Sequence, residues 1–256
     1  MFSWFKKKEM ETQNTTKIID ENSNIVQVDI HSHLLYGIDD GARSIEITLQ
    51  LAKEFVEMGY KKMIFTPHIM LDGYKNTPEI ILNRLADVKI ALAENNIDLE
   101  VEAAAEYYLD EGFLKKIRQN EELLSFGKEK YILFETGFRN KPQGLKELIF
   151  DLQSSGYKPI WAHPERYYYL HDNRELLDMM LERGVLLQIN QVSLVNFYGD
   201  ACREYAEFLV KEKFVNFIGS DCHSLRYVGA MKDLKKNKIY QKLGELNLLN
   251  NSLYLG

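Results

Sequence analysis

The sequence VDIHSHLLYGIDDGA, residues 28–42, begins with the pattern of a strand and ends with that of a turn. Its first residues continue the β-branched run Ile25-Val26, which is typical of a buried strand. His31 and His33 are two residues apart, so both imidazoles leave the same face of an extended chain. Two imidazoles at a strand end suit one divalent cation, although two structural histidines produce the same pattern. The acidic, glycine-containing residues 37–41 predict a turn with close backbone approach.

The composition is that of an ordinary globular protein. The chain has 256 residues, 45% hydrophobic and 27% charged, which suits one large α/β domain or two small ones. A net charge of −6 argues against a general nucleic-acid-binding surface. No apolar run approaches the ~20 residues that span a bilayer, and no signal peptide is recognised. Cys202 and Cys222 are too few and isolated for a disulfide framework or a thiolate zinc site, so we expect a cytoplasmic protein.

The N-terminus places three aromatic residues before three lysines: Phe2, Trp4 and Phe5, then Lys6, Lys7 and Lys8. A short membrane-surface anchor has this pattern. So few residues bury little apolar area, however, and residues 9–24 are polar. We therefore favour a flexible tail over residues 1–24 and a folded domain over residues 25–256.

Seven apolar strands alternate with helices along the rest of the chain. Further strands are expected at 62–66, 98–105, 131–134, 159–162, 185–190 and 214–219. Helices are expected at 45–58, 78–94, 111–119, 142–155, 173–183 and 200–213, followed by a helical tail from Val228 that Asn250 and Asn251 interrupt. Ser44 and Thr77 are expected as N-caps, and Gly59 as a helix stop. Continuously apolar strands alternating with helices predict an α/β fold with a parallel sheet, either a closed (β/α) barrel or an open doubly wound sheet.

Polar side chains gather at the predicted strand ends. Five of the six histidines and three carboxylates lie at or just past a strand C-terminus: His31, His33, His68, Glu106, Glu135, His163, Asp221 and His223. In barrels the C-terminal rim carries the reactive groups. Each residue alone has a structural explanation, but their common placement at one rim favours a shared site. His171 is outside this pattern and is expected on the surface.

Eight mixed nitrogen and oxygen ligands are too many for one tetrahedral zinc ion and suit two or three cations with a bridging carboxylate. Imidazole with carboxylate is compatible with Mn²⁺, Fe or Zn²⁺. Clustered cations generate hydroxide and stabilise the attacking and leaving oxygens of a displacement at phosphorus. Arg166 lies three residues after His163 and is near enough to hold a phosphoryl group bidentately, but an ion pair with Glu165 fits its spacing equally well.

These motifs together resemble the PHP (polymerase and histidinol phosphatase) superfamily. Within it, the chain is similar to the bacterial capsule-locus tyrosine phosphatases of the CpsB or YwqE kind. The resemblance rests on DIHSH at 29–33 with GIDDGA at 37–42, TPH at 66–68, YILFE at 131–135, AHPERY at 162–167 and SDCH at 220–223. GIDDGA is the element most specific to the tyrosine phosphatases. Tyr36 departs from the pattern, because the family usually has proline there.

The resemblance implies a distorted (β/α)₇ barrel, a manganese-dependent cluster and hydrolysis of phosphotyrosine by metal-activated hydroxide. The implied substrate is the phosphorylated tail of a membrane-associated bacterial tyrosine kinase that controls capsular or exopolysaccharide synthesis. The resemblance also implies that the eight rim residues are metal ligands and that Arg166 is a catalytic phosphate contact. Glu102 competes with Glu106 for its place in this set.

Three other functions share parts of this pattern. A small-molecule phosphatase such as histidinol phosphatase uses the same kind of cluster. An amidohydrolase also begins with His-x-His, but commonly has a bridging lysine where this chain has Glu135. A non-catalytic module that binds the kinase tail is the third alternative, and it is disfavoured because converging polar groups are costly to bury without a ligand. A cysteine-dependent route is also disfavoured, since neither cysteine is followed six residues later by arginine.

Overall fold

The computed structural model describes residues 25–254, so the expectations for residues 1–24, including the tail and the aromatic–lysine anchor, lie outside the described residues. The strands are β1 (Val28–Asp29), β2 (Lys62–Phe65), β3 (His68–Ile69), β4 (Glu100–Ala103), β5 (Glu106–Tyr108), β6 (Tyr131–Glu135), β7 (Lys158–Ala162), β8 (Leu186–Asn190) and β9 (Val215–Gly219). They form two sheets, in the orders β1-β2-β4 and β3-β5-β6-β7-β8-β9, and all of these strand pairs are parallel. The predicted α/β class with parallel strands is confirmed.

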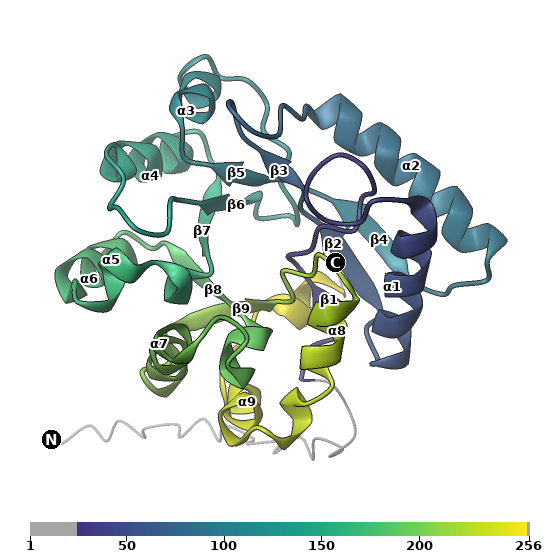
Figure 1. Cartoon of the computed structure of the whole chain (residues 1–256). Coiled ribbons are helices and arrows are strands. Elements are labelled where there is room, and N and C mark those ends of the chain that lie inside the picture. Colours follow the sequence, from purple (N-terminus) through teal and green to yellow (C-terminus); the bar gives the residue numbers. More distant parts are fainter. Residues whose placement is uncertain (1–24, 255–256) are drawn as a thin grey trace, which may run out of the picture.

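Helices surround these strands (Figure 1). They are α1 (Ile45–Glu57), α2 (Pro78–Glu94), α3 (Glu111–Arg118), α4 (Leu145–Ser154), α5 (Tyr168–His171), α6 (Arg174–Glu182), α7 (Asp200–Lys211), α8 (Leu225–Met231) and α9 (Lys238–Lys242). Short 3₁₀ segments are η1 (Pro164–Arg166), η2 (Gln191–Val195), η3 (Leu234–Lys236), η4 (Leu243–Glu245) and η5 (Asn250–Leu253). Within residues 25–254, no helix has both the length and the apolar composition needed to cross a membrane.

Two of the seven expected strands, 62–66 and 98–105, are each followed after a short break by a further strand that was not predicted, and these breaks divide the sheet. Residues 66–67 separate β2 from β3, and residues 104–105 separate β4 from β5. Pro67 lies in the first break, where it has no ladder N–H to donate. Glu106 consequently belongs to β5 rather than following a continuous strand.

Backbone hydrogen bonds join the segments that follow the first and last strands. Beyond the ends of β1 and β9, Asp221 N donates to His31 O at 2.8 Å, and His33 N donates to Cys222 O at 3.0 Å. Within β1 and β9 themselves, the link is made by a side chain. The buried Asn250 amide donates to Val28 O of β1 at 2.9 Å and to Ile218 O of β9 at 2.8 Å. Its Oδ1 accepts from Ile218 N at 3.1 Å. These bonds give the strands the ring-like course seen in Figure 1.

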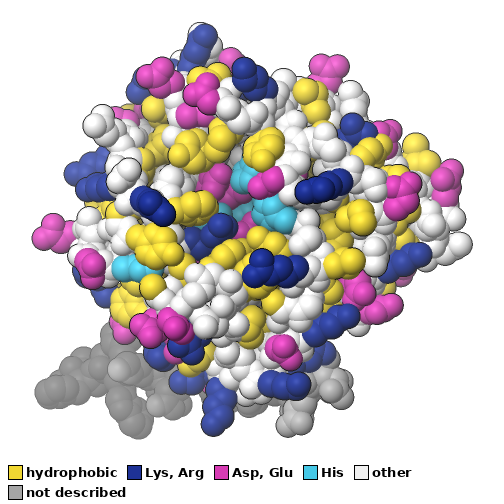
Figure 2. All heavy atoms as spheres, viewed as in Figure 1, with side chains coloured by type: hydrophobic (Ala, Val, Ile, Leu, Met, Phe, Trp, Pro, Cys, Tyr) yellow, Lys and Arg dark blue, Asp and Glu magenta, His cyan; other side chains and the backbone are white. Residues whose placement is uncertain are grey.

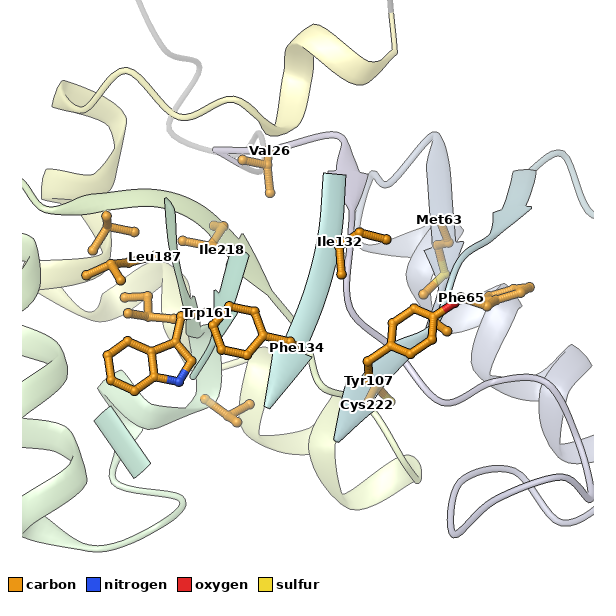
Figure 3. Packing of buried hydrophobic residues seen from close by; sticks show 14 of the residues in the cluster. Val26, Met63, Phe65, Tyr107, Ile132, Phe134, Trp161, Leu187, Ile218 and Cys222 are labelled. Carbon is orange, nitrogen blue, oxygen red and sulfur yellow. The ribbon is translucent and has the colours of Figure 1, made fainter. Parts of the chain in front are cut away.

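Alternate strand residues divide between two buried clusters, because successive side chains point to opposite faces. In β6, Ile132 and Phe134 belong to the large cluster that includes helix residues, whereas Leu133 belongs to a smaller cluster. Figure 3 shows the large cluster, in which Phe134 and Trp161 stack with parallel rings. Apolar residues on both faces explain the continuously hydrophobic strand sequences.

Local signals set most helix ends but not all of them. Thr77 caps α2 by accepting from Ile80 N, as expected, and Gly59 follows α1 with a φ of +97°. Ser44 occupies the N-cap position of α1, but its side chain makes no capping hydrogen bond, so that detail of the prediction is wrong. Helix α4 begins at Leu145 instead of residue 142, after Gly144 with a φ of +76°.

The C-terminal asparagines have a different role from the one predicted. Asn250 was expected to break a helix, but it begins η5 and is fully buried between β1 and β9. An asparagine side chain carries both donors and an acceptor, so it can replace ladder bonds that the two strands do not make with each other.

We expect Asn250→Ala to lower the free energy of unfolding by about 2–3 kcal/mol, because it leaves buried backbone groups of two strands without partners. Asn251→Ala is the matched control, since that side chain is exposed, and we expect it to cost less than about 1 kcal/mol. Urea denaturation measures both. Equal losses for the two variants contradict a special role for Asn250.

Candidate metal centre and active site

The eight predicted rim residues meet in one cluster. His31 and His33 follow β1, His68 begins β3, Glu106 begins β5, Glu135 ends β6, His163 follows β7, and Asp221 and His223 follow β9. Figure 2 shows histidine side chains at the bottom of a hollow bordered by hydrophobic and basic groups. A cavity of about 540 Å³ opens over this cluster.

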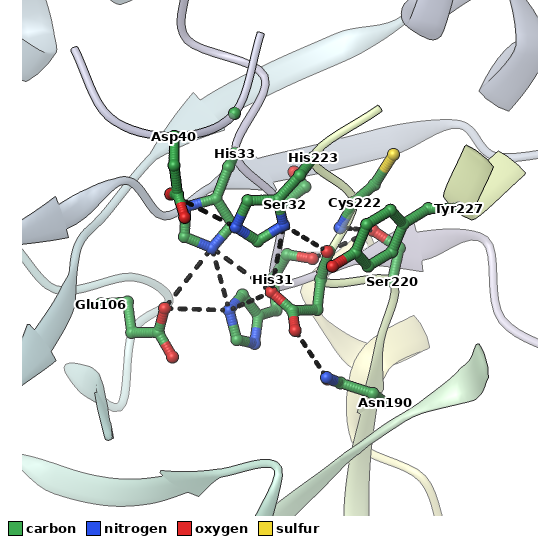
Figure 4. Close-up of polar contacts among 12 residues, drawn as sticks. His31, Ser32, His33, Asp40, Glu106, Asn190, Ser220, Cys222, His223 and Tyr227 are labelled. Atoms are coloured by element: carbon green, nitrogen blue, oxygen red, sulfur yellow. Dashed lines mark hydrogen bonds and ion pairs between the residues drawn. The ribbon is translucent and has the colours of Figure 1, made fainter. Parts of the chain in front are cut away.

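Glu106 lies at the centre of the cluster. Its Oε2 is 3.2 Å from His31 Nε2, 3.4 Å from His33 Nε2 and 3.2 Å from His68 Nδ1. Figure 4 shows the first two imidazoles turned toward this carboxylate. Glu102, the competing acid in the sequence, instead pairs with Lys62 Nζ at 2.8 Å. The structure therefore places Glu106, and not Glu102, in the site.

Hydrogen bonds at the outer ring nitrogens orient the imidazoles. His31 Nδ1 lies 2.8 Å from Gln188 Oε1, and His33 Nδ1 lies 2.8 Å from Asp39 Oδ2. Both partners are acceptors, so each Nδ1 donates its proton outward and each Nε2 faces the cluster. This is the protonation pattern that a metal-ligating histidine requires.

Asp40 is a candidate ligand that the sequence reasoning missed. Its Oδ1 is 3.5 Å from His68 Nε2 and 3.4 Å from His223 Nε2, and these residues form one possible ligand group with His33. Burial opposes ionisation of Asp40, but His223 and the other imidazoles lower its pKa to about 2. Asp40 lies in the GIDDGA turn and at no strand end, so strand position gave no signal for it. Its place in an acidic turn beside His-x-His was the available signal.

Three further ligand groups occur in the cluster. They are His31 with His33 and Asp221, His31 with Glu106 and His163, and His68 with Glu106 and Glu135. Glu106 is the carboxylate that occurs in two of these groups, so it is the candidate for the bridging carboxylate, which stays a prediction.

Burial and neighbouring charges shift the acid–base behaviour of these residues. Burial and the Arg166 cation lower the pKa of His163 to about 4. Burial and the nearby Glu106 raise the pKa of Glu135 well above its usual value. Burial disfavours the charged form of Glu106 too, but His31 and His163 hold the Glu106 pKa well below the ordinary range. The neighbouring carboxylates therefore repel one another, and further positive charge is needed to balance them.

The residues present fit bound cations. Glu106 Oε2 and His68 Nδ1 are buried, lie 3.2 Å apart and have no hydrogen-bond partner among the described residues. Buried polar atoms without a hydrogen-bond partner are costly, and a cation between these two would satisfy both. Ligand atoms bound to one cation at about 2.1 Å lie roughly 3.0–3.4 Å apart, which agrees with the spacings around Glu106.

Arg166 lies beside this cluster. Its Nη1 donates to Asp221 Oδ2 at 2.8 Å, so the alternative ion pair with Glu165 is not formed. Glu165 is instead buried, and its Oε1 accepts from Asn190 N at 2.8 Å and Ser193 Oγ at 2.7 Å. Arg166 also borders the cavity, which leaves part of its guanidinium accessible to an anion.

The backbone adopts unusual conformations next to the ligands. His163 and Asp221 have φ values of +34° and +50°, in the left-handed region that side chains rarely adopt. A Cβ on Gly219 meets His31 Cβ at 2.7 Å, and one on Gly41 overlaps the His33 carbonyl. These two glycines permit the close packing behind the paired histidines.

Tyr36, which departs from the family proline, packs against α2. Its ring lies under the Arg84 guanidinium, 4.0 Å from ring centroid to Cζ, and its hydroxyl donates to Asp87 at 3.3 Å. The following Gly37 has a φ of +71° and still permits the turn. His171, expected on the surface, is half-buried and bonds to Glu165 O at 2.8 Å.

A parallel α/β fold with a histidine–carboxylate cluster beside its strand ends is typical of metal-dependent hydrolases. The chain belongs to the CpsB/CapC family of capsular polysaccharide synthesis, whose sequence model matches residues 27–248. The tyrosine-protein phosphatase YwqE of Bacillus subtilis strain 168 is 32% identical over 199 residues, 78% of each chain. CapC of Staphylococcus aureus is 30% identical over 233 residues, 89% of this chain and 91% of its own.

Solved structures agree with this assignment. One chain from the crystal structures of Bacillus subtilis YwqE and Streptococcus pneumoniae CpsB, described as metal-dependent tyrosine phosphatases, aligns with a TM-score of 0.76. It is 30% identical, and the match covers 88% of this chain and 94% of that chain. An amidohydrolase from Mycoplasma synoviae aligns with a TM-score of 0.55 at 13% identity, a likeness of fold alone.

We expect chelation to lower the melting temperature and added Mn²⁺ to restore it, since a cation at 100 times its dissociation constant contributes about 2.7 kcal/mol. Glu106→Gln should remove most of this Mn²⁺-dependent shift, because Glu106 faces three imidazoles. Glu102→Gln is the control and should keep the shift. The shift should also shrink as pH falls, because protons compete with cations for the imidazoles. Calorimetry on chelated and reconstituted protein measures these changes, and an equal shift in both variants contradicts the assignment.

Proposed function

We propose that this protein is a metal-dependent protein-tyrosine phosphatase of capsular or exopolysaccharide synthesis. The observation that carries the proposal is the meeting of Glu106 Oε2 with three imidazoles beside Arg166, within a family whose relatives are named tyrosine-protein phosphatases. The nitrogen and oxygen donors support Mn²⁺ as the cofactor, in two or three ions, and are also compatible with Fe or Zn²⁺.

The chain's own residues would hold the cofactor in adjoining groups. His31 belongs to one group with His33 and Asp221 and to another with Glu106 and His163. His68 belongs to one group with Glu106 and Glu135 and to another with His33, Asp40 and His223. Bound cations lower the pKa of water and offset negative charge on the phosphoryl group. Gln188 and Asp39 orient two of the imidazoles, so that the ligand atoms are placed before a cation arrives.

Arg166 would bind the phosphoryl oxygens. Asp221 holds one guanidinium nitrogen, while the accessible part of Arg166 borders the cavity above the cluster. A guanidinium binds phosphate through two parallel N–H donors, which gives orientation as well as charge. A tyrosine leaving group has a pKa of ~10, so it needs less help from a general acid than a serine alkoxide does.

The cysteines are poorly placed to act as nucleophiles. Cys222 is fully buried, and burial raises the pKa of its thiol. Cys202 is also buried, in α7. Burial therefore favours the unreactive thiol form of both residues.

The substrate that we propose is the phosphorylated tail of a membrane-associated bacterial tyrosine kinase, with the phosphatase acting in the cytoplasm. Small-molecule phosphatase activity of the histidinol phosphate type is the alternative, because it would use the same ligands. A module that only binds the tail is less favoured, since its buried carboxylates would repel one another without cations.

Turnover of a phosphotyrosine peptide, a phosphoserine peptide and histidinol phosphate distinguishes these functions. We expect chelation to abolish turnover, Mn²⁺ to restore it, and the phosphotyrosine peptide to have the highest kcat/KM. Equal or greater activity on histidinol phosphate contradicts the tyrosine assignment. No turnover of any substrate by the reconstituted protein favours the binding module.

We expect Arg166→Ala to lower kcat/KM for the phosphotyrosine peptide by about 10²–10³, the usual cost of losing one group that stabilises transition-state charge. Arg166→Lys keeps the charge but loses the planar pair of donors, so an intermediate loss is expected. Arg174→Ala, at an exposed position on α6, is the control and should change little. Steady-state kinetics at equal metal content measures the effect, and full activity of Arg166→Ala refutes the role.

A further inference from the structure

We propose that the rings of Phe138 and Tyr198 form a clamp on the Arg166 guanidinium and that both are positioning residues for phosphoryl binding. The proposal rests on the role of Arg166 given above and goes beyond it, because neither Phe138 nor Tyr198 belongs to a predicted ligand group. They lie next to two predicted ligands, since the Tyr198 hydroxyl donates to Asp221 and the Phe138 ring lies 6.0 Å from that of His163.

The guanidinium contacts both rings closely. Arg166 Cζ lies 4.5 Å from the centroid of Phe138 and 4.4 Å from that of Tyr198. Both rings therefore lie within cation–π distance of the same guanidinium. Guanidinium groups within about 6 Å of an aromatic face are attracted by the ring quadrupole and stack on it.

One edge of the guanidinium is also fixed. Asp221 Oδ2 accepts from Arg166 Nη1 at 2.8 Å, from Asn190 Nδ2 at 2.6 Å and from the Tyr198 hydroxyl at 3.1 Å. Asp221 Oδ1 faces the other way, 3.4 Å from His31 Nε2. The two oxygens therefore serve different purposes, since Oδ2 anchors the arginine and Oδ1 faces the proposed cations.

The clamp is built from three separate connections of the fold. Phe138 lies between β6 and α4, Arg166 ends η1, and Tyr198 lies between η2 and α7. The Phe138 carbonyl accepts from Tyr168 N at 2.9 Å, which ties this loop to the one that carries Arg166. The Tyr198 ring packs edge-on against Phe197.

The Phe138 side chain is 38% exposed, a large fraction for phenylalanine, and it borders the cavity above the cluster. Because this ring is exposed, the protein gives up part of the free energy that burial of its apolar surface would provide. Its contact with Arg166 limits the rotation of a long side chain that would otherwise sample many rotamers. An arginine held in one plane can present its free N–H edge to a phosphoryl group without first being ordered.

The test combines Phe138→Leu with Arg166→Ala in a double-mutant cycle, using full-length protein reconstituted with Mn²⁺ to equal metal content. Competitive inhibition by inorganic phosphate and kcat/KM for the phosphotyrosine peptide are measured for each variant. We expect Phe138→Leu to raise the phosphate inhibition constant about 5- to 20-fold and to lower kcat/KM similarly. In the Arg166→Ala background the same change should have less than about a twofold effect.

Further variants separate the ring from other features. Phe138→Tyr keeps the aromatic face, so its phosphate inhibition constant and kcat/KM should stay within about twofold of those of the parent protein. This variant keeps the proposal testable if Phe138→Leu does not fold. Tyr198→Leu should resemble Phe138→Leu, whereas Tyr198→Phe keeps the ring and should lose less. Phe150→Leu is the matched control, since Phe150 is exposed on α4 and does not line this cavity.

An undiminished effect of Phe138→Leu in the Arg166→Ala background overturns the proposal, because the ring then acts independently of the arginine. Unchanged phosphate inhibition in Phe138→Leu overturns it as well. If Arg166→Ala itself leaves phosphate inhibition and kcat/KM unchanged, the proposed role of the arginine fails, and the clamp fails with it.

Discussion

The burial of negative charge around Glu106 is the constraint on which the rest of this structure depends. Glu106 Oε2 is surrounded by imidazole nitrogens and has no hydrogen-bond donor among the described residues. A buried charge without a partner costs several kcal/mol, so this arrangement persists only with compensating cations or with a shifted protonation state. The opposite pKa shifts of Glu106 and Glu135 show how close the carboxylates are to mutual repulsion. The fold must hold these groups together against that repulsion.

The joined first and last strands supply this restraint. Asp29 accepts from Ser220 N at 2.8 Å and from its hydroxyl at 2.6 Å, and Ser220 lies between β9 and Asp221. Burial raises the pKa of Asp29 to about 6, which reflects the cost of placing this link inside the protein. The left-handed φ of Asp221 costs on the order of 1–3 kcal/mol, which the surrounding bonds must offset. Rigid backbone pairing therefore pre-organises side chains that would otherwise separate.

Strand ends were predictable from sequence because they depend on local signals. A buried apolar run followed by histidine or a carboxylate marks a strand end in a parallel fold, and this rule located His68 and His163. It did not locate Asp40, since a turn residue reaches its partners only through the tertiary course of the loop. Asn250 was misinterpreted for the same reason: two asparagines favour a break locally, but the strands need a buried donor and acceptor there. Long-range bonding thus overrode local propensity.

The surroundings of Arg166 show a similar division between local and long-range determinants. AHPERY placed Arg166 near His163, but its spacing did not decide between Glu165 and a phosphate as partner. The fold decides against Glu165, because that carboxylate is used to bind Asn190 N and Ser193 Oγ. Asn190 in turn donates to Asp221 Oδ2, which leaves Glu165, Asn190 and Asp221 acting as one connected support. Through Asp221 this support contacts both the arginine and the imidazoles, so the proposed geometries of phosphoryl binding and of cation binding are coupled.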